Sequence, residues 1–126
     1  MSNISMSNKG VIRDFIKAWQ SLDAERLGGY FTDDGIYHNM PAEPVQGREA
    51  IVEFIKGFAG GWTATEWEVV SIVEDGDLVI AERVDRIDIG EKHVDLPCVG
   101  IFEMQDGKIK IWRDYFDLGT YMKAFG

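Results

Sequence analysis

The second half of this 126-residue chain alternates long runs of β-branched and aromatic residues with short turn signals. Two turns, Glu74–Asp77 and Gln105–Lys108, contain an Asp-Gly pair, and Ile89–Glu91 supplies a third turn. An Asp-Gly pair between apolar runs is a strong hairpin signal, because tight hairpin turns need residues that tolerate positive φ. Pro97 predicts a bulge or an edge, because proline has no N–H for the ladder. The pattern predicts an antiparallel meander of four strands, near 63–74, 78–89, 92–104 and 108–117.

Before this meander, apolar residues recur every three to four positions, which indicates helices with one buried stripe. The first helix is expected over about 7–21, and Asp23 is the expected N-cap of a short second helix that reaches Phe31. A short strand, Ile36–Met40, follows, and a third helix begins near Arg48. Helices followed by a meander predict the α+β class, with about three N-terminal helices over one face of a curved sheet.

Length and composition indicate a single folded domain. A chain of 126 residues with 45% hydrophobic and 28% charged residues leaves no room for a second core. We expect residues 1–6 to form a short flexible N-terminus and residues 7–126 to form the domain. No apolar run approaches the roughly 18 residues of a membrane span. The first residues also lack the apolar core of a signal peptide, so we expect a cytoplasmic protein.

Charge and cysteine content narrow the expected partners. The formal charge is −9, from 22 acidic and 13 basic residues, so a nucleic-acid backbone or an anionic membrane surface would be repelled. The single cysteine, Cys98, has no partner in the chain for a disulfide, and we interpret it as a small core hydrophobe. Two histidines and one cysteine without paired spacing do not form a zinc-ligand pattern, so no metal is expected.

Strand alternation brings an arginine and an aspartate together on the more apolar side of the predicted strand 78–89. Arg83 and Asp85 are two residues apart, so they share a face. Either they form a buried pair in which each neutralises the other, or they form an ordinary solvated pair. Only the buried pair would have usefully perturbed pKa values, and structural ion pairs are commoner than sites.

A second carboxylate occurs in the predicted strand 108–117, where Asp114 shares a face with Trp112 and Phe116. The alternative is a surface charge on a wet outer face. Periodicity does not choose between them, because both faces of this strand contain apolar residues.

Two polar residues share one side of the short strand that precedes Pro41. Tyr37 and Asn39 would offer a hydroxyl and an amide to one point. The alternative is that Asn39 caps the turn before the proline. His38 faces the opposite side and is expected to be a packing or surface residue, and the same holds for His93.

Three blocks together resemble the limonene-1,2-epoxide hydrolase family: Tyr37–Pro41, Glu82–Asp85 and Trp112–Leu118. They occur in the family's order, and the resemblance covers almost the whole chain, including the Gly100–Phe102 stretch. That family has a cone-shaped α+β fold, shared with ketosteroid isomerases and nuclear-transport-factor-like proteins. The resemblance therefore implies a curved mixed sheet and a deep apolar pocket between sheet and helices.

The same resemblance implies the roles of five residues. Asp85 is the expected general acid and Asp114 the expected general base, with Arg83 between the two carboxylates. Tyr37 and Asn39 are expected to hold the nucleophilic water together with Asp114. The implied activity is the one-step addition of water to a small, mostly apolar epoxide, cyclic by preference, which gives a vicinal diol without a cofactor.

Strand position suggests Ile87, Leu96 and Phe116 as residues that line the pocket. A homodimer is expected from the resemblance alone. Two other readings stay open at this stage. An isomerase or cyclase of the ketosteroid-isomerase type would use one aspartate as a base opposite an oxyanion donor, a chemistry that an arginine between two aspartates does not suit. A non-catalytic ligand-binding module of the same fold would be favoured by an exposed Arg83.

Overall fold

The computed structural model describes residues 6–125, so the first five residues of the predicted flexible N-terminus lie outside the described residues. The described helices are α1 Asn8–Ala18, α2 Ala24–Gly28, α3 Arg48–Phe58 and α4 Leu118–Phe125, and a short 3-10 helix, Trp19–Ser21, follows α1. The strands are β1 Phe31–Asn39, β2 Val45–Gln46, β3 Ala64–Asp75, β4 Leu78–Ile89, β5 Lys92–Gln105 and β6 Lys108–Phe116. None of the described helices is long and apolar enough to cross a membrane.

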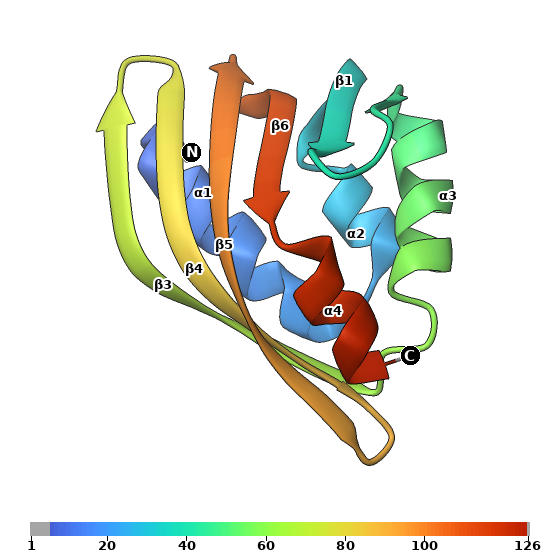
Figure 1. Cartoon of the computed structure of the whole chain (residues 1–126). Coiled ribbons are helices and arrows are strands. Elements are labelled where there is room, and N and C mark those ends of the chain that lie inside the picture. The colour runs from blue at the N-terminus through green and yellow to red at the C-terminus, as the bar shows by residue number, and fades with distance from the viewer. Residues whose placement is uncertain (1–5, 126) are drawn as a thin grey trace.

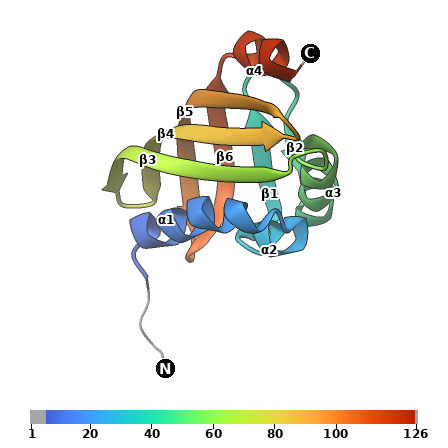
Figure 2. The ribbon, with the colours of Figure 1, turned by 90° about the horizontal axis from the view of Figure 1, so that it is seen from below.

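The six strands of the described residues form one mixed sheet in the order β2-β1-β6-β5-β4-β3. Strands β3 to β6 form the predicted antiparallel meander, and the strand bounds agree with the sequence prediction within a residue or two. Strand β1 pairs with β6 in parallel, so Tyr37 lies opposite Trp112 and Asn39 opposite Asp114. The long strands bend, and α1 lies along β3 and β4 (Figures 1 and 2). The predicted α+β class with a curved sheet is confirmed.

Helices α1 and α2 each begin after a residue whose side chain caps them, and for α2 this is the predicted Asp23. The side chain of Ser7 accepts a hydrogen bond from the N–H of Gly10 at 3.0 Å, and α1 then buries one apolar stripe that includes Ile12 and Phe15. Asp23 caps α2 by accepting from the N–H of Arg26 at 3.2 Å. Such a cap satisfies a backbone donor that the first helical turn leaves free.

The predicted end of the second helix was wrong. Helix α2 ends at Gly28, and β1 already begins at Phe31, with a register shift between Phe31 and Ile36. Phe31 is fully buried and pairs with Ile109 on β6. Tertiary pairing therefore overrides the turn signal of residues 32–35, which lie inside the strand.

Pro97 marks an edge and not a bulge. It pairs with Val84 in the continuous β4–β5 register, whereas β6 pairs with β5 only from Cys98 onward. The proline thus lies where β5 has no strand on its second side, so its missing N–H costs no ladder hydrogen bond.

A fourth α-helix, α4, was not predicted. Asp117 precedes it and accepts hydrogen bonds from the backbone N–H of Thr120 at 3.1 Å and from its hydroxyl at 2.6 Å. This local cap, Asp117 followed three residues later by Thr120, was the signal available in the sequence. The helix extends from the end of β6 beside β5 (Figure 1).

Candidate active site

Three charged side chains are buried in the concave interior of the sheet. Arg83 is 0% exposed, and Asp85 and Asp114 are each 3% exposed. The first two come from the middle of β4, and Asp114 comes from β6, two strands away. Of the two interpretations left open by the strand pattern, the structure supports the buried pair.

One guanidinium holds both carboxylates. Arg83 Nε and Nη2 donate to Asp85 Oδ1 and Oδ2 at 2.9 and 2.8 Å, and Nη1 and Nη2 donate to Asp114 Oδ1 and Oδ2 at 2.8 and 2.9 Å. The arrangement is bidentate on both sides and uses four of the five N–H donors of arginine. The guanidinium carbon also lies 4.5 Å from the centre of the Trp67 ring, which gives a cation–π contact. The position of the cation is therefore set from three strands.

Gly100 leaves the space that the guanidinium occupies. This glycine pairs with Asp114 on β6 and with Ala81 on β4. A Cβ at this position would lie 2.8 Å from Arg83 Nη1 and 2.9 Å from Trp112 Nε1, well inside contact distance. A glycine inside a strand often marks such a close approach, and that signal would have identified Gly100 as a site residue.

Tyr37 and Asn39 line the same cavity as Asp114. The Tyr37 ring stacks on Trp112 at 4.3 Å with an interplanar angle of 6°, which fixes the phenol. Asn39 is 4% exposed, and its Oδ1 has no hydrogen-bond partner among the described residues. The turn after it is closed by its backbone carbonyl, which accepts from Ala42 at 2.7 Å, so its side-chain oxygen remains available to a molecule in the cavity.

The cavity is narrow: the space open to a water-sized molecule is about 10 Å³, far below the roughly 300–1,000 Å³ of most ligand pockets, so the deep pocket that the resemblance implies stays a prediction. The predicted lining residues Ile87, Leu96 and Phe116 all contact it. The sequence did not single out four further lining residues, Phe58, Trp62, Trp67 and Cys98.

Helix α4 lies against this aromatic wall. The hydroxyl of Tyr121 accepts a hydrogen bond from Trp62 Nε1 at 2.9 Å. The Tyr121 ring also stacks on Phe58 with 5.5 Å between the ring centres. These two contacts join the C-terminal helix to residues of α3 and of the segment that follows it.

Burial and charge together control the protonation of the site. Burial raises the pKa of Asp114, the Arg83 guanidinium opposes this shift, and the neighbouring charge of Asp85 adds to it. Burial also raises the pKa of Tyr37, and Asp114 raises it further, so the phenol stays neutral. One cation between two carboxyls is electrically neutral when the pair holds one proton.

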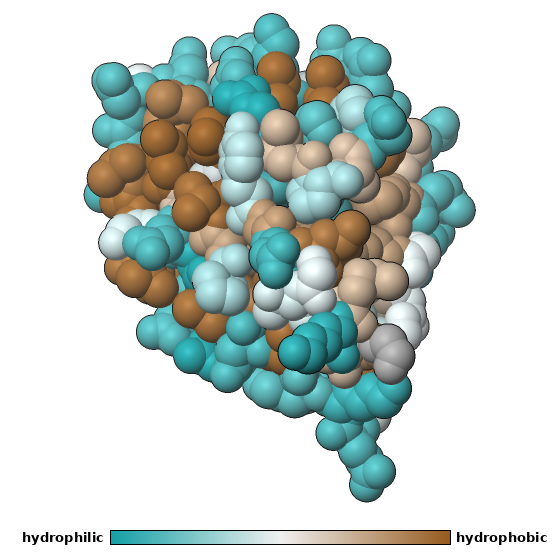
Figure 3. All heavy atoms as spheres, viewed as in Figure 1, coloured by the Kyte–Doolittle hydropathy of each residue, from teal (hydrophilic) through white to brown (hydrophobic). Residues whose placement is uncertain are grey.

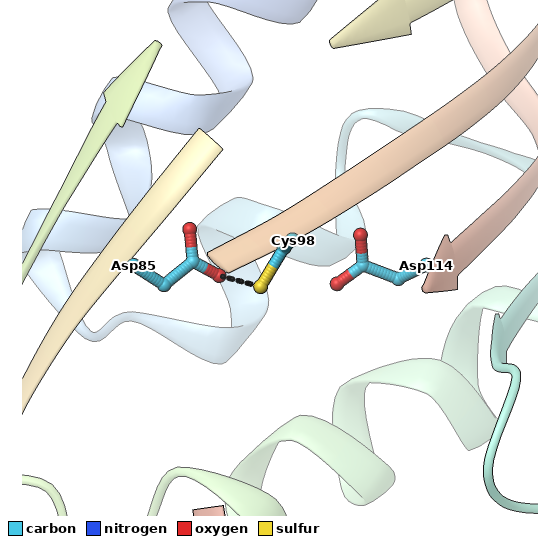
Figure 4. Close-up of side chains that lie close together, drawn as sticks. All are labelled: Asp85, Cys98 and Asp114. Carbon is cyan, nitrogen blue, oxygen red and sulfur yellow. Dashed lines mark hydrogen bonds between the residues drawn. The ribbon is translucent and has the colours of Figure 1, made fainter. Parts of the chain in front are cut away.

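One carboxylate oxygen each of Asp85 and Asp114 and the sulfur of Cys98 lie within 4.8 Å of one another, and the three residues come from three adjacent strands (Figure 4). The donor set does not fit a metal ion, because the Arg83 guanidinium already lies between the two carboxylates and bonds all four of their oxygens. A divalent ion would have to displace this buried cation.

Neither histidine is near the cavity. His38 Nε2 lies 2.9 Å from the carbonyl of Ala42. His93 lies between Asp88 and Asp95, with N···O distances of 2.5 and 2.6 Å, and it is half exposed. The expectation that both are packing or surface residues agrees with these positions.

Fold and site together define a class: a cone-like α+β domain whose curved sheet buries two carboxyls and one arginine beside an aromatic cavity. The chain resembles a protein with a ketosteroid isomerase-like fold from Catenulispora acidiphila, at 20% identity with a TM-score of 0.82, covering 90% of each chain. It also resembles a SnoaL-like protein from Shewanella putrefaciens, at 15% identity with a TM-score of 0.82, covering 95% of this chain and 97% of the other. At these identities the likeness concerns the fold alone.

Residues 6–126 match the limonene-1,2-epoxide hydrolase catalytic domain, and the chain belongs to that family. It is 31% identical over 113 residues to epoxide hydrolase EphG of Mycobacterium tuberculosis, covering 90% of this chain and 75% of the relative. The structure of an LEH-like epoxide hydrolase from the same organism matches with a TM-score of 0.80 and 29% identity, over 93% of this chain and 87% of the other. The family resemblance seen in the sequence is confirmed.

Proposed function

We propose that this protein is an epoxide hydrolase that adds water to a small, mostly apolar epoxide, cyclic by preference, to give a vicinal diol. Family membership and the EphG relative support hydrolysis of an epoxide. The observation that carries the proposal is the double bidentate contact of Arg83 with Asp85 and Asp114, beside an Asn39 amide oxygen that has no hydrogen-bond partner within residues 6–125. The narrowness of the cavity and its aromatic wall favour a compact, apolar substrate.

In the proposed reaction, Tyr37, Asn39 and Asp114 bind one water. Asp114 takes a proton from this water as its oxygen attacks an epoxide carbon, and the bond between that carbon and the ring oxygen breaks. Asp85 delivers its proton to the ring oxygen, so the product is a neutral diol. The reaction needs one neutral and one ionised carboxyl at the same pH, and one proton shared by the pair around the Arg83 cation would supply both forms.

The surroundings of the site favour attack by water itself over attack by a carboxylate. A covalent ester route needs a second base to hydrolyse the ester, a task usually given to histidine. His38 and His93 are held by hydrogen bonds away from the cavity. The proposed route is therefore a single step with inversion at the attacked carbon.

The burial of Arg83 also separates this proposal from its alternatives. An exposed Arg83 would have favoured a non-catalytic module, and the residue is 0% exposed. An isomerase that uses one aspartate as base has no use for a guanidinium bonded to both carboxyls.

The proposed function is tested by diol formation from a panel of cyclic and acyclic epoxides. The mechanism is tested by a single turnover in heavy-oxygen water with enzyme in excess. Label in the first diol formed supports direct attack by water, whereas an unlabelled first diol would show that the oxygen came from a protein carboxylate. Asp114→Asn serves as the inactive control.

The predicted homodimer rests on the family resemblance and stays a prediction. Apolar surface gathers over the part of the sheet that contains β3 to β5, on the left of Figure 3. Exposed large apolar side chains on these strands and on β6 include Val70, Val73, Val99 and Tyr115. Sedimentation of the purified chain measures its oligomeric state directly.

A further inference from the structure

Cys98 makes a contact that the proposed reaction does not yet use. Its sulfur lies 3.4 Å from Asp85 Oδ2 and also 3.4 Å from the carbonyl oxygen of Leu96. Figure 4 shows the sulfur between the two carboxyl groups, with its hydrogen bond directed to Asp85. The residue is 3% exposed and lines the cavity, so the thiol lies at the site itself.

A thiol has one hydrogen and so donates to one of these two oxygens at a time. When Asp85 is ionised, its carboxylate is the stronger acceptor, because it carries the charge. When Asp85 holds a proton, the carbonyl of Leu96 can receive the thiol hydrogen. The side chain can therefore follow the protonation state of its neighbour by rotation about one bond.

We propose that Cys98 is a positioning residue for the general acid, whose thiol donates to Asp85 and supports the carboxylate left after proton delivery. This inference rests on the proposed function, because it assigns the thiol to the proton-donating side of that reaction. The charged and titratable groups around Asp85 are Arg83 on its own strand, Asp114 from β6, Cys98 from β5 and Tyr37 from β1.

Among these groups the thiol acts as a neutral donor and not as a nucleophile. Burial raises the pKa of Cys98, and the nearby charge of Asp85 raises it further, so the thiolate is not formed. A neutral thiol next to an epoxide does not compete with the activated water. Cys98 thus adds a third hydrogen bond to Asp85, beside the two from Arg83, without adding charge.

The first test compares two variants of nearly equal shape, Cys98→Val and Cys98→Thr. Valine removes the donor, which destabilises the ionised acid, so the alkaline limb of the kcat profile should move up by about half a pH unit. Threonine keeps a hydroxyl donor, so its alkaline limb should lie at the wild-type pH or at a lower pH. A mere packing role would affect both variants alike and leave the limb in place. Val94→Ala on the same buried face of β5 controls for loosened packing.

The second test reads the contact without using activity. Cys98 is the only cysteine in the chain, so the S–H stretching band in the infrared spectrum belongs to it alone. The band should shift to lower frequency as the carboxyl pair ionises with rising pH, and Asp85→Asn should abolish that dependence.

The two tests separate the two proposals. A wild-type protein that hydrolyses no epoxide would refute the proposed function, and the role of Cys98 in supporting the general acid would be refuted with it. The infrared band would still report whether the thiol donates a hydrogen bond to Asp85. The role of Cys98 alone would be overturned by an active enzyme with two properties. Its S–H band would change neither with pH nor in Asp85→Asn, and its Cys98→Val and Cys98→Thr variants would have the wild-type pH profile of kcat.

Discussion

Gly100→Ala should disable the site through a single methyl group. The new Cβ would lie 2.8 Å from Arg83 Nη1, and 2.9 Å from both Trp112 Nε1 and a Phe102 ring carbon. All three neighbours are fully buried, and the guanidinium is also held by four hydrogen bonds. Since ordinary contacts begin near 3.4 Å, relief requires a movement of roughly half an ångström or more in a packed core.

The cost of this movement falls on both stability and activity. Overpacking a core typically costs about 1–3 kcal/mol in the free energy of unfolding. Displacing Arg83 also disturbs both carboxyls, and a misplacement of about 1 Å can lower a rate by about a hundredfold. We therefore expect kcat/KM to fall by about a hundredfold, together with a lower urea midpoint.

Gly57→Ala is the matched control. Gly57 lies within α3, and a Cβ there would meet nothing within 4 Å. Alanine in a helix interior is worth about 0.5–1 kcal/mol over glycine, so this variant should be slightly more stable and fully active. If Gly100→Ala kept wild-type kcat/KM and stability, the packing of Arg83 against this strand would be looser than the structure implies, and the reasoning would fail.

The remaining predictions concern the carboxyl pair, the Tyr121 contact and a surface histidine. Asp85→Asn and Asp114→Asn should each lower kcat by at least about a hundredfold, and the double variant should lose far less than the product of the two losses, because both belong to one proton-transfer unit; a multiplicative loss in steady-state kinetics would contradict a shared unit. Tyr121→Ala removes the partner of Trp62 and should raise the rate on bulkier epoxides relative to compact ones; unchanged relative rates across a size series would show that α4 does not limit the substrate. Asp88 and Asp95 raise the pKa of His93 above its ordinary value of 6.5, so its stabilising effect is complete below about that pH and is lost as pH rises through the raised value. The unfolding free energy of His93→Asn should therefore approach that of the wild type as pH increases, and a gap that does not depend on pH would exclude this origin.

Local periodicity was sufficient for much of the fold and for the choice of site residues. The Asp-Gly turns set the phase of the meander, and strand alternation then placed Arg83 and Asp85 on the same face as observed. These features depend on neighbours within a few positions, which is the range over which side-chain direction is determined. The roles of the acid and the base came from the family resemblance and not from the pattern.

Tertiary structure decided which residues lie next to one another in the site. The parallel pairing of β1 with β6 brings Asn39 next to Asp114, although 75 positions, 39 to 114, separate them along the chain. Cys98 was interpreted as a core hydrophobe, and only the register of β5 against β4 places its sulfur at Asp85. The roles of Gly100 and α4 also depend on tertiary structure, because each acts through contacts with residues that are distant in the sequence. The strand pattern specifies which face of the sheet a residue occupies. The distance between the two carboxyls and the cation that they share depends on how three strands align, and no local sequence pattern contains that alignment.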